Sequence, residues 1–286
     1  MIVVALTVWA FELVLGGGGL PGLAIAAAIA IAMSWGAYWK SDAIALAMSH
    51  AKPADQEEHA RLHNVVEGLC IAGGLPKPRV YVIEDPAPNA FATGRNPRHA
   101  AVAVTTGLLE KMNRVELEGV LAHELSHIKN YDILVSTIAV TMVGVVALMA
   151  DVAFRFLWWG GAGHRRDRRG GGSGPQAALV VFGVALLILL PVVARLMRYA
   201  VSRRREALAD VTAVSLTRYP PGLISALEKL RDDTTVVHSA SRATAHLWIE
   251  APVGRERADG GRLARINRMF DTHPPLEERI EALREL

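Results

Sequence analysis

Two histidines and a glutamate stand close together in this sequence, at a spacing that can hold a metal ion. His123, Glu124 and His127 form the pattern His-Glu-x-x-His inside residues 117–130, which are expected to form a helix. Side chains four residues apart share one face of a helix, so both imidazoles can bind the same ion while Glu124 polarises a bound water molecule. The pattern predicts metal-assisted hydrolysis, and two ordinary histidines on an amphipathic helix are the alternative interpretation.

A catalytic zinc ion needs a third protein ligand besides two histidines. The extended motif that supplies a third histidine requires glycine at position 130 and histidine at position 133, where this sequence has Asn130 and Ile133. The other common solution is a glutamate on a later helix, and residues 202–210 offer Glu206. Asp210 lies four residues further on the same helix face, where it can accept a hydrogen bond from a ligand histidine. Glutamate and aspartate at this spacing also occur on ordinary solvated helices.

The two ligand segments belong to a polar part of the chain that we expect to fold as one compact domain. Residues 56–72 alternate charged and apolar side chains at helical spacing, and residues 79–84 and 101–106 have the composition of short strands. A last helix is expected after Pro275, with carboxylates in its first turn, where the helix dipole favours them. The polar part is therefore predicted to be an α+β domain with a small sheet.

The composition indicates a membrane protein with a sizeable polar part. Of 286 residues, 51% are hydrophobic, and the mean hydropathy of +0.26 is unusual for a soluble chain. Apolar stretches that suit bilayer helices lie at residues 1–15, 21–39, 133–150 and 177–194. Glycines and a proline within residues 16–22 suit a tight hairpin between the first two. A cleaved signal peptide is the alternative, but no basic residue precedes the apolar run and no convincing cleavage site follows it.

Aromatic and basic residues at the end of the second apolar stretch indicate its orientation. Three aromatic side chains within residues 35–39, followed by Lys40, form a belt and an anchor that place the following residues on the cytoplasmic side. An arginine-rich loop at residues 164–175 conflicts with the positive-inside rule if the second hairpin crosses the membrane, and complete crossing stays open. A hairpin that leaves and returns on one side brings Glu206 back to the level of the histidines.

These features divide the chain into four parts and define its expected fold class. The parts are an N-terminal transmembrane hairpin (1–40), the first part of the metal-binding domain (41–131), a second hydrophobic hairpin (132–199) and the second part of the domain (200–286). We therefore expect a mainly α integral membrane protein with four hydrophobic helices and one polar α+β domain.

Charge and cysteine content argue against two other classes of protein. The 31 basic and 28 acidic residues leave a net charge of +3 and are interleaved, so a nucleic-acid partner is not expected. Cys70 is the single cysteine, which excludes an internal disulfide framework, and a small buried side chain in a helix explains it best.

The combined motifs resemble the HtpX-type membrane-bound zinc metallopeptidases, which are gluzincins related to the CAAX prenyl endopeptidase. Besides the two apolar hairpins, the resemblance rests on NAFATG at 89–94, HELSH at 123–127, SRRREALAD at 202–210 and THPPLEERIEAL at 272–283. It implies a zincin-like domain with one Zn²⁺ per chain, in a multi-pass protein of the bacterial inner membrane with its active site facing the cytoplasm. It also implies cleavage of unfolded or misfolded proteins in membrane quality control, often together with other membrane proteases. The arginine-rich loop is the departure from the family pattern.

The resemblance also implies roles for residues that spacing alone does not single out. His273 is the nominated hydrogen-bond donor to the oxyanion, with Tyr199 as a second candidate, and His273 can equally be the cap of the last helix. Asn89 and Ala90 are expected to hold the substrate backbone, as the matching motif does in thermolysin-like enzymes. A turn after Pro88 is the alternative role for Asn89.

A strand just before the active-site helix is also expected to bind substrate. Ala101, Val102, Ala103 and Val104 are small or β-branched, which suits an edge strand that pairs with an extended peptide. Backbone pairing does not discriminate among side chains, so broad specificity for unfolded segments would follow.

We therefore expect a membrane-bound zinc endopeptidase in which Glu124 acts first as a base and then as an acid. Zinc lowers the pKa of a bound water to about 7, so Glu124 can take its proton and pass it to the leaving amine. A catalytically silent, zinc-containing membrane scaffold is the alternative, but a structural zinc site has no need of Glu124. A transporter ranks last, because the few charges within the apolar stretches lie near their ends.

Overall fold

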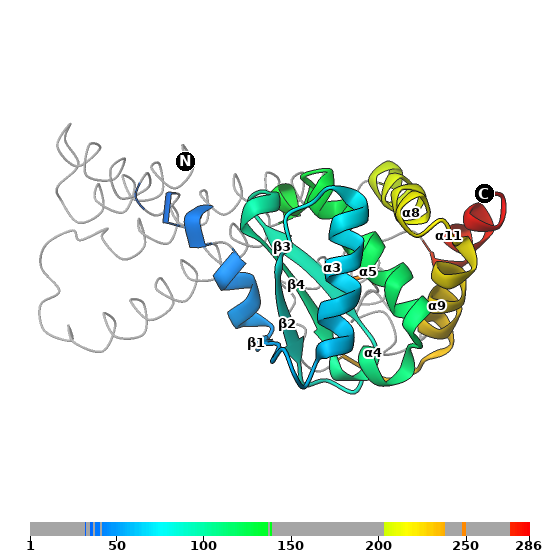
Figure 1. Cartoon of the computed structure of the whole chain (residues 1–286), viewed down its shortest axis with the longest axis horizontal. Helices are drawn as coiled ribbons and strands as arrows, with labels where there is room; N and C mark the ends of the chain where they lie inside the picture. The colour runs from blue at the N-terminus through cyan, green and yellow to red at the C-terminus, as the bar shows by residue number, and fades with distance from the viewer. Residues whose placement is uncertain are drawn as a thin grey trace, which may run out of the picture. The chain divides into compact units, whose positions relative to one another are not determined.

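Most of the predicted polar domain is described by the computed structural model. The described residues are 32, 35, 36, 38–40, 42–136, 138, 203–237, 248–249 and 275–286. From residue 42 onward these residues belong to one compact unit, which combines a small mixed sheet with a larger number of helical residues (Figure 1). The expectation of an α+β domain with a small sheet is confirmed for this unit.

A mixed sheet forms one layer of the unit. In the described part of the chain its strands are β1 (Lys52–Pro53), β2 (Arg79–Ile83), β3 (Ala90–Gly94) and β4 (Ala100–Thr105). They are arranged in the order β1-β2-β4-β3. β4 runs parallel to β2 and antiparallel to β3, so it lies inside the sheet, and β3 forms an outer strand.

The prediction that residues 101–104 form a substrate-binding edge strand is wrong. Ala101, Val102, Ala103 and Val104 all pair with β2 on one side and with β3 on the other. Their side chains are fully buried, and an uninterrupted run of apolar residues is typical of a strand covered on both faces. The outer strand beside β4 is β3, whose residues AFATG lack the alternation that marks a strand in a sequence.

Helices α3 (Ala60–Gly73) and α5 (Arg114–Lys129) cover one face of the sheet (Figure 1). Their apolar side chains join alternate residues of the strands in the main hydrophobic core. A smaller cluster on the opposite face contains residues of the 42–48 helix together with Phe91 and Trp248. The sheet is therefore buried between two apolar layers.

Helix α3 begins later than the periodicity of residues 56–72 predicts. The side chain of Asp55 accepts hydrogen bonds from the backbone amides of Glu57 and Glu58, at 2.9 and 3.0 Å. An aspartate that bonds to the following amides favours a turn over a helix. The regular helix consequently starts at Ala60.

Helix α5 lies between the sheet and the C-terminal helices (Figure 1). It starts at a capping box in which Asn113 and Glu116 bond to each other's backbone amides. The remaining helical elements are α4 (Thr106–Lys111), the 3₁₀ turn η1 (Pro97–His99), α8 (Arg203–Thr217), α9 (Pro220–Asp232) and α11 (Leu276–Arg284). Gly119 lets α9 approach closely, because a Cβ atom there would lie 2.8 Å from the backbone of Leu223.

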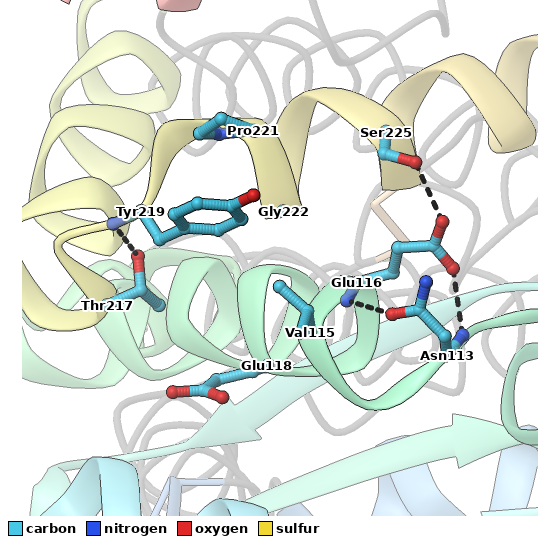
Figure 2. A pocket seen from close by; sticks show the side chains of 9 residues that line it. All are labelled: Asn113, Val115, Glu116, Glu118, Thr217, Tyr219, Pro221, Gly222 and Ser225. Carbon is cyan, nitrogen blue, oxygen red and sulfur yellow. Dashed lines mark hydrogen bonds between the residues drawn. The ribbon is translucent and has the colours of Figure 1, made fainter.

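A cavity of about 600 Å³ lies where the start of α5 meets the turn between α8 and α9 (Figure 2). Its lining includes the buried Glu116, whose carboxylate accepts hydrogen bonds from Ser225 Oγ at 2.7 Å, Lys229 Nζ at 2.7 Å and the Asn113 amide at 2.8 Å. These bonds tie α5 to α9. None of His123, Glu124 and His127 lines this cavity, so we assign Glu116 a structural role.

Among the described residues, no helix combines the length and the apolar character that crossing a membrane requires. The predicted hairpins at residues 1–40 and 132–199 lie almost entirely outside the described residues. The four apolar spans and the boundaries between the four parts of the chain therefore stay predictions.

Candidate metal centre

The side chains of His123, His127 and Glu206 meet where α5 packs against α8. Their ligand atoms lie within 4.8 Å of one another. The two Nε2 atoms are 3.2 Å apart, and the Glu206 oxygens lie 3.6 Å from Nε2 of His123 and 3.5 Å from Nε2 of His127. The structure thus brings together three residues that the sequence suggests as ligands.

The separations between the two imidazole nitrogens and the two oxygens of Glu206 are of the size that a tetrahedral metal ion requires. Zinc binds imidazole nitrogen and carboxylate oxygen at roughly 2.0–2.2 Å, so two of its tetrahedral ligands lie roughly 3.4 Å apart. The three observed separations, from 3.2 to 3.6 Å, are close to that value. Two imidazoles and one carboxylate also form a donor set that zinc favours, with a fourth position left for water.

The charges around the cluster favour a divalent cation. Among the described residues, four carboxylates and two guanidinium groups gather here, which leaves two negative charges when the imidazoles are neutral. They are Glu124, Asp132, Glu206, Asp210, Arg205 and Arg279. Burial and Arg279 lower the pKa of His123, but Asp210 and Glu206 outweigh them and raise it to about 9. Surroundings that stabilise a proton on His123 also stabilise a metal cation at Nε2.

Asp210 holds the first ligand histidine from behind. Nδ1 of His123 lies 2.8 Å from Oδ1 of Asp210, so we assign the tautomer in which Nδ1–H donates and Nε2 faces the cluster. The guanidinium of Arg279 in turn donates to both oxygens of Asp210, from Nε at 2.9 Å and from Nη2 at 2.7 Å. Burial alone raises the pKa of Asp210, but the charges of Arg279 and His123 hold it well below its ordinary value.

A second aspartate, which the sequence analysis does not single out, holds the other ligand histidine. Oδ2 of Asp132 lies 3.0 Å from Nδ1 of His127, and Oδ1 lies 2.8 Å from Nε of Arg205. The preceding residue, Tyr131, has φ of 60° and reverses the chain just after α5. This left-handed turn, uncommon for a residue other than glycine, brings Asp132 back to its own helix.

Two arginines are also absent from the site predicted by sequence. Arg279 belongs to the THPPLEERIEAL motif and Arg205 to SRRREALAD, so membership of a motif was a signal for both. A basic residue next to a membrane segment is, however, explained more simply by anionic lipid, and Arg279 has no spacing relation to the histidines. Their contacts with Asp210 and Asp132 in the folded structure place both arginines in the site.

Asn89 and Ala90 stand at the start of β3, the outer strand that contacts α5. The Asn89 amide donates to Thr105 Oγ1 at 2.9 Å, and its side-chain oxygen accepts from the Ala90 amide at 3.0 Å. Asn89 is thereby fixed at the entrance to the strand. The other two predicted residues, His273 and Tyr199, lie outside the described residues.

One protein family and several curated proteins are similar to this chain over most of its length. The model of a family described as peptidase family M48 matches residues 56–286. A "Protease HtpX homolog" of Thermoanaerobacter pseudethanolicus is 45% identical over 268 residues, which cover 94% of this chain and 86% of that protein. A "Protease HtpX homolog" of Listeria monocytogenes serovar 1/2a is 43% identical over 269 residues, covering 92% and 86%. Among solved structures, S. mikatae Ste24p matches with a TM-score of 0.46 at 19% identity, over 88% of this chain and 58% of Ste24p.

Proposed function

Because this chain belongs to peptidase family M48 and is a metalloprotease, we propose that it is a zinc-dependent endopeptidase whose ion is held by His123, His127 and Glu206. The observation that carries the proposal is the set of separations, 3.2 to 3.6 Å, among the two histidine Nε2 atoms and the carboxylate oxygens of Glu206. A zinc ion bound there would supply a water of lowered pKa and would polarise the peptide carbonyl.

Glu124 moves the proton in this proposal. It follows His123 directly on α5 and is buried beside the ligands, at 2% exposure. Its carboxylate accepts the proton of the attacking water and then donates it to the leaving nitrogen, which therefore departs as a neutral amine. His273 remains the proposed donor to the oxyanion.

The aspartates orient the ligand imidazoles. Asp210 accepts from His123 and Asp132 accepts from His127, which keeps both Nε2 lone pairs directed at the ion. Arg279 and Arg205 restrain the two aspartates. The ligands are thus held in place before the ion binds.

We propose that substrates bind in extended form along β3, with Asn89 and Ala90 holding their backbone. An outer strand offers main-chain donors and acceptors that any unfolded segment can use, whatever its side chains. This supports cleavage of unfolded or misfolded proteins, including membrane proteins, with little sequence specificity.

The proposed location is the bacterial inner membrane, with the active site on the cytoplasmic side. The apolar stretches in residues 1–40 and 132–199 support two hairpins of membrane helices, with residues 41–131 and 200–286 forming the protease domain between and after them. The enzyme would then act in membrane quality control, in contact with the bilayer and alongside other membrane proteases.

The test is hydrolysis of an unfolded protein by the detergent-solubilised, zinc-loaded chain, with Glu124→Gln as the paired variant at equal zinc content. We expect cleavage by the parent and none above background by the variant, because glutamine cannot accept the proton. Equal cleavage by both would identify a contaminant. No cleavage by either, although both hold zinc, would contradict the proposal.

A further inference from the structure

Two residues from a distant part of the chain occupy the outer edge of β3. The Ile249 amide donates a hydrogen bond of 2.9 Å to the carbonyl of Ala90. The carbonyl of Asn89 accepts from the Thr105 amide of β4, at 3.0 Å. Because successive backbone carbonyls of a strand point to opposite sides, the carbonyl of Ala90 points away from β4. Ile249 therefore binds the outward-facing edge.

The side chains of the same two residues continue the pattern of the sheet. Trp248 is 0% exposed and packs against Phe91, with ring centroids 4.9 Å apart, in the smaller apolar cluster. Ile249 is 1% exposed and belongs to the main core, which contains Ala90 and Ala92. Successive residues of a strand point to opposite faces, so Trp248 and Ile249 are placed as a short strand added to the sheet would be.

One feature distinguishes this added segment from an ordinary part of the core. Nε1 of Trp248 is buried and has no hydrogen-bond partner among the described residues. An unpaired buried donor destabilises the state that contains it. We call the arrangement in which Trp248 and Ile249 cover the outer edge of β3 the closed arrangement. It is therefore less favourable than the burial of two large apolar side chains alone would suggest.

We propose that Trp248 and Ile249 act as an internal competitor for the substrate-binding edge, which an extended substrate must displace before it can be cleaved. The inference rests on the proposed function, in which β3 holds the substrate backbone. The outward-facing carbonyl of Ala90 accepts the Ile249 amide, and a substrate strand that pairs with the same edge of β3 would have to take the position that Ile249 occupies.

The closed arrangement makes a demand on the substrate. A segment that takes the edge must replace the lost backbone bond, and it must offer apolar side chains to both faces in place of Trp248 and Ile249. Extended segments with consecutive apolar residues meet this requirement, and unfolded proteins expose such segments from buried strands and from membrane helices. Short polar peptides and folded surfaces do not meet it. The contact would therefore add a preference for apolar segments to the otherwise broad backbone recognition at β3.

The test compares Ile249→Pro with Ile249→Val in the full-length, zinc-loaded chain. Proline removes the amide donor, whereas valine keeps both the donor and a branched apolar side chain. We expect kcat/KM for a short polar reporter peptide to rise about two- to tenfold in Ile249→Pro, which corresponds to the loss of one hydrogen bond, and to stay at the parent value in Ile249→Val. Unchanged or lower activity of Ile249→Pro, at parent zinc content and Tm, would overturn the inference.

A second measurement covers the case in which the proline variant does not fold. Hydrogen exchange is followed in Glu124→Gln, with and without a saturating unfolded apolar peptide, so that binding is seen without cleavage. We expect the peptide to protect amides of residues 89–94 and to speed exchange at Ile249. Protection of 89–94 with unchanged exchange at Ile249 would overturn this inference alone. Peptide binding that leaves 89–94 unaffected would overturn the proposed substrate edge, and the inference with it.

Discussion

Each ligand histidine is backed by an aspartate and an arginine, and the two sets differ in burial. The buried pair, Asp210 and Arg279, stands behind His123, with side chains 7% and 3% exposed. The outer pair, Asp132 and Arg205, stands behind His127, with side chains 10% and 24% exposed. The same chemical task, orienting an imidazole, is thus carried out in two different dielectric surroundings.

The two pairs are expected to contribute differently to stability. Water reaches Arg205 and can solvate either charge of the outer pair if its partner is lost. Water does not reach the buried pair in this way, so removing one partner leaves an uncompensated charge in the interior. We therefore expect the buried pair to matter for folding as well as for the metal, and the outer pair to matter mainly for the metal.

The largest effect is expected from Arg279→Ala. Asp210 would then be buried near Glu206 without its cation, which should lower the free energy of unfolding by about 3–5 kcal/mol. Thermal unfolding of the full chain, with and without zinc, measures the change. The matched control is Arg284→Ala on the same helix, whose exposed guanidinium pairs with Glu228 at 2.7 Å. Equal Tm values for the two variants would contradict the assignment of a buried pair.

The next effect separates the two aspartates. Asp210→Asn and Asp132→Asn should each weaken zinc binding by about 10- to 100-fold, because each removes the anionic acceptor of a ligand imidazole. Asp210→Asn should lie at the upper end, since it also leaves Arg279 unneutralised next to His123. Competition with a zinc chelator measures both affinities. A weaker effect of Asp210→Asn than of Asp132→Asn would reverse the comparison.

A third buried carboxylate, Glu116, lies away from the metal ligands. The pH dependence of stability there tests whether a buried charged group contributes to the stability of the fold. Burial raises its pKa, but hydrogen bonds from Lys229, Ser225 and the Asn113 amide outweigh burial and hold the pKa below its ordinary value of 4.5. A carboxyl group with a lowered pKa stabilises the fold above its ordinary pKa and loses that contribution as the pH falls through the lowered one.

Glu116→Gln should therefore lower stability by about 1 kcal/mol at neutral pH and flatten the fall in stability below pH 4.5. Denaturation at a series of pH values, for parent and variant, measures the slope. Zinc affinity at neutral pH serves as the control and should not change. A parent-like slope in the variant would show that Glu116 does not titrate as its contacts suggest.

The smallest effect is expected from Arg205→Ala. Its guanidinium is about a quarter exposed, so the loss of stability should stay below about 1 kcal/mol. Thermal unfolding beside Arg279→Ala measures the contrast directly. If the two variants lose equal stability, exposure does not govern these pairs and the comparison fails.

Much of the secondary structure follows from local patterns. The strands expected at residues 79–84 and 101–106 and the helix expected at 117–130 are found with small shifts of their ends. The capping box at Asn113 explains why α5 starts earlier than expected. Strand order did not follow, because pairing depends on contacts between segments far apart in the chain. β4 therefore proved to be an interior strand, and β3 an outer one.

The spacing of His123 and His127 by itself determines that both imidazoles face the same side of one helix, because the period of the helix is a local property. The position of Glu206 opposite them, and the pairing of Asp210 with Arg279, were decided only by the packing of α5, α8 and α11. Local periodicity specifies which side chains share a face. Only the folded chain specifies which faces meet, because long-range packing selects among many arrangements of the same helices.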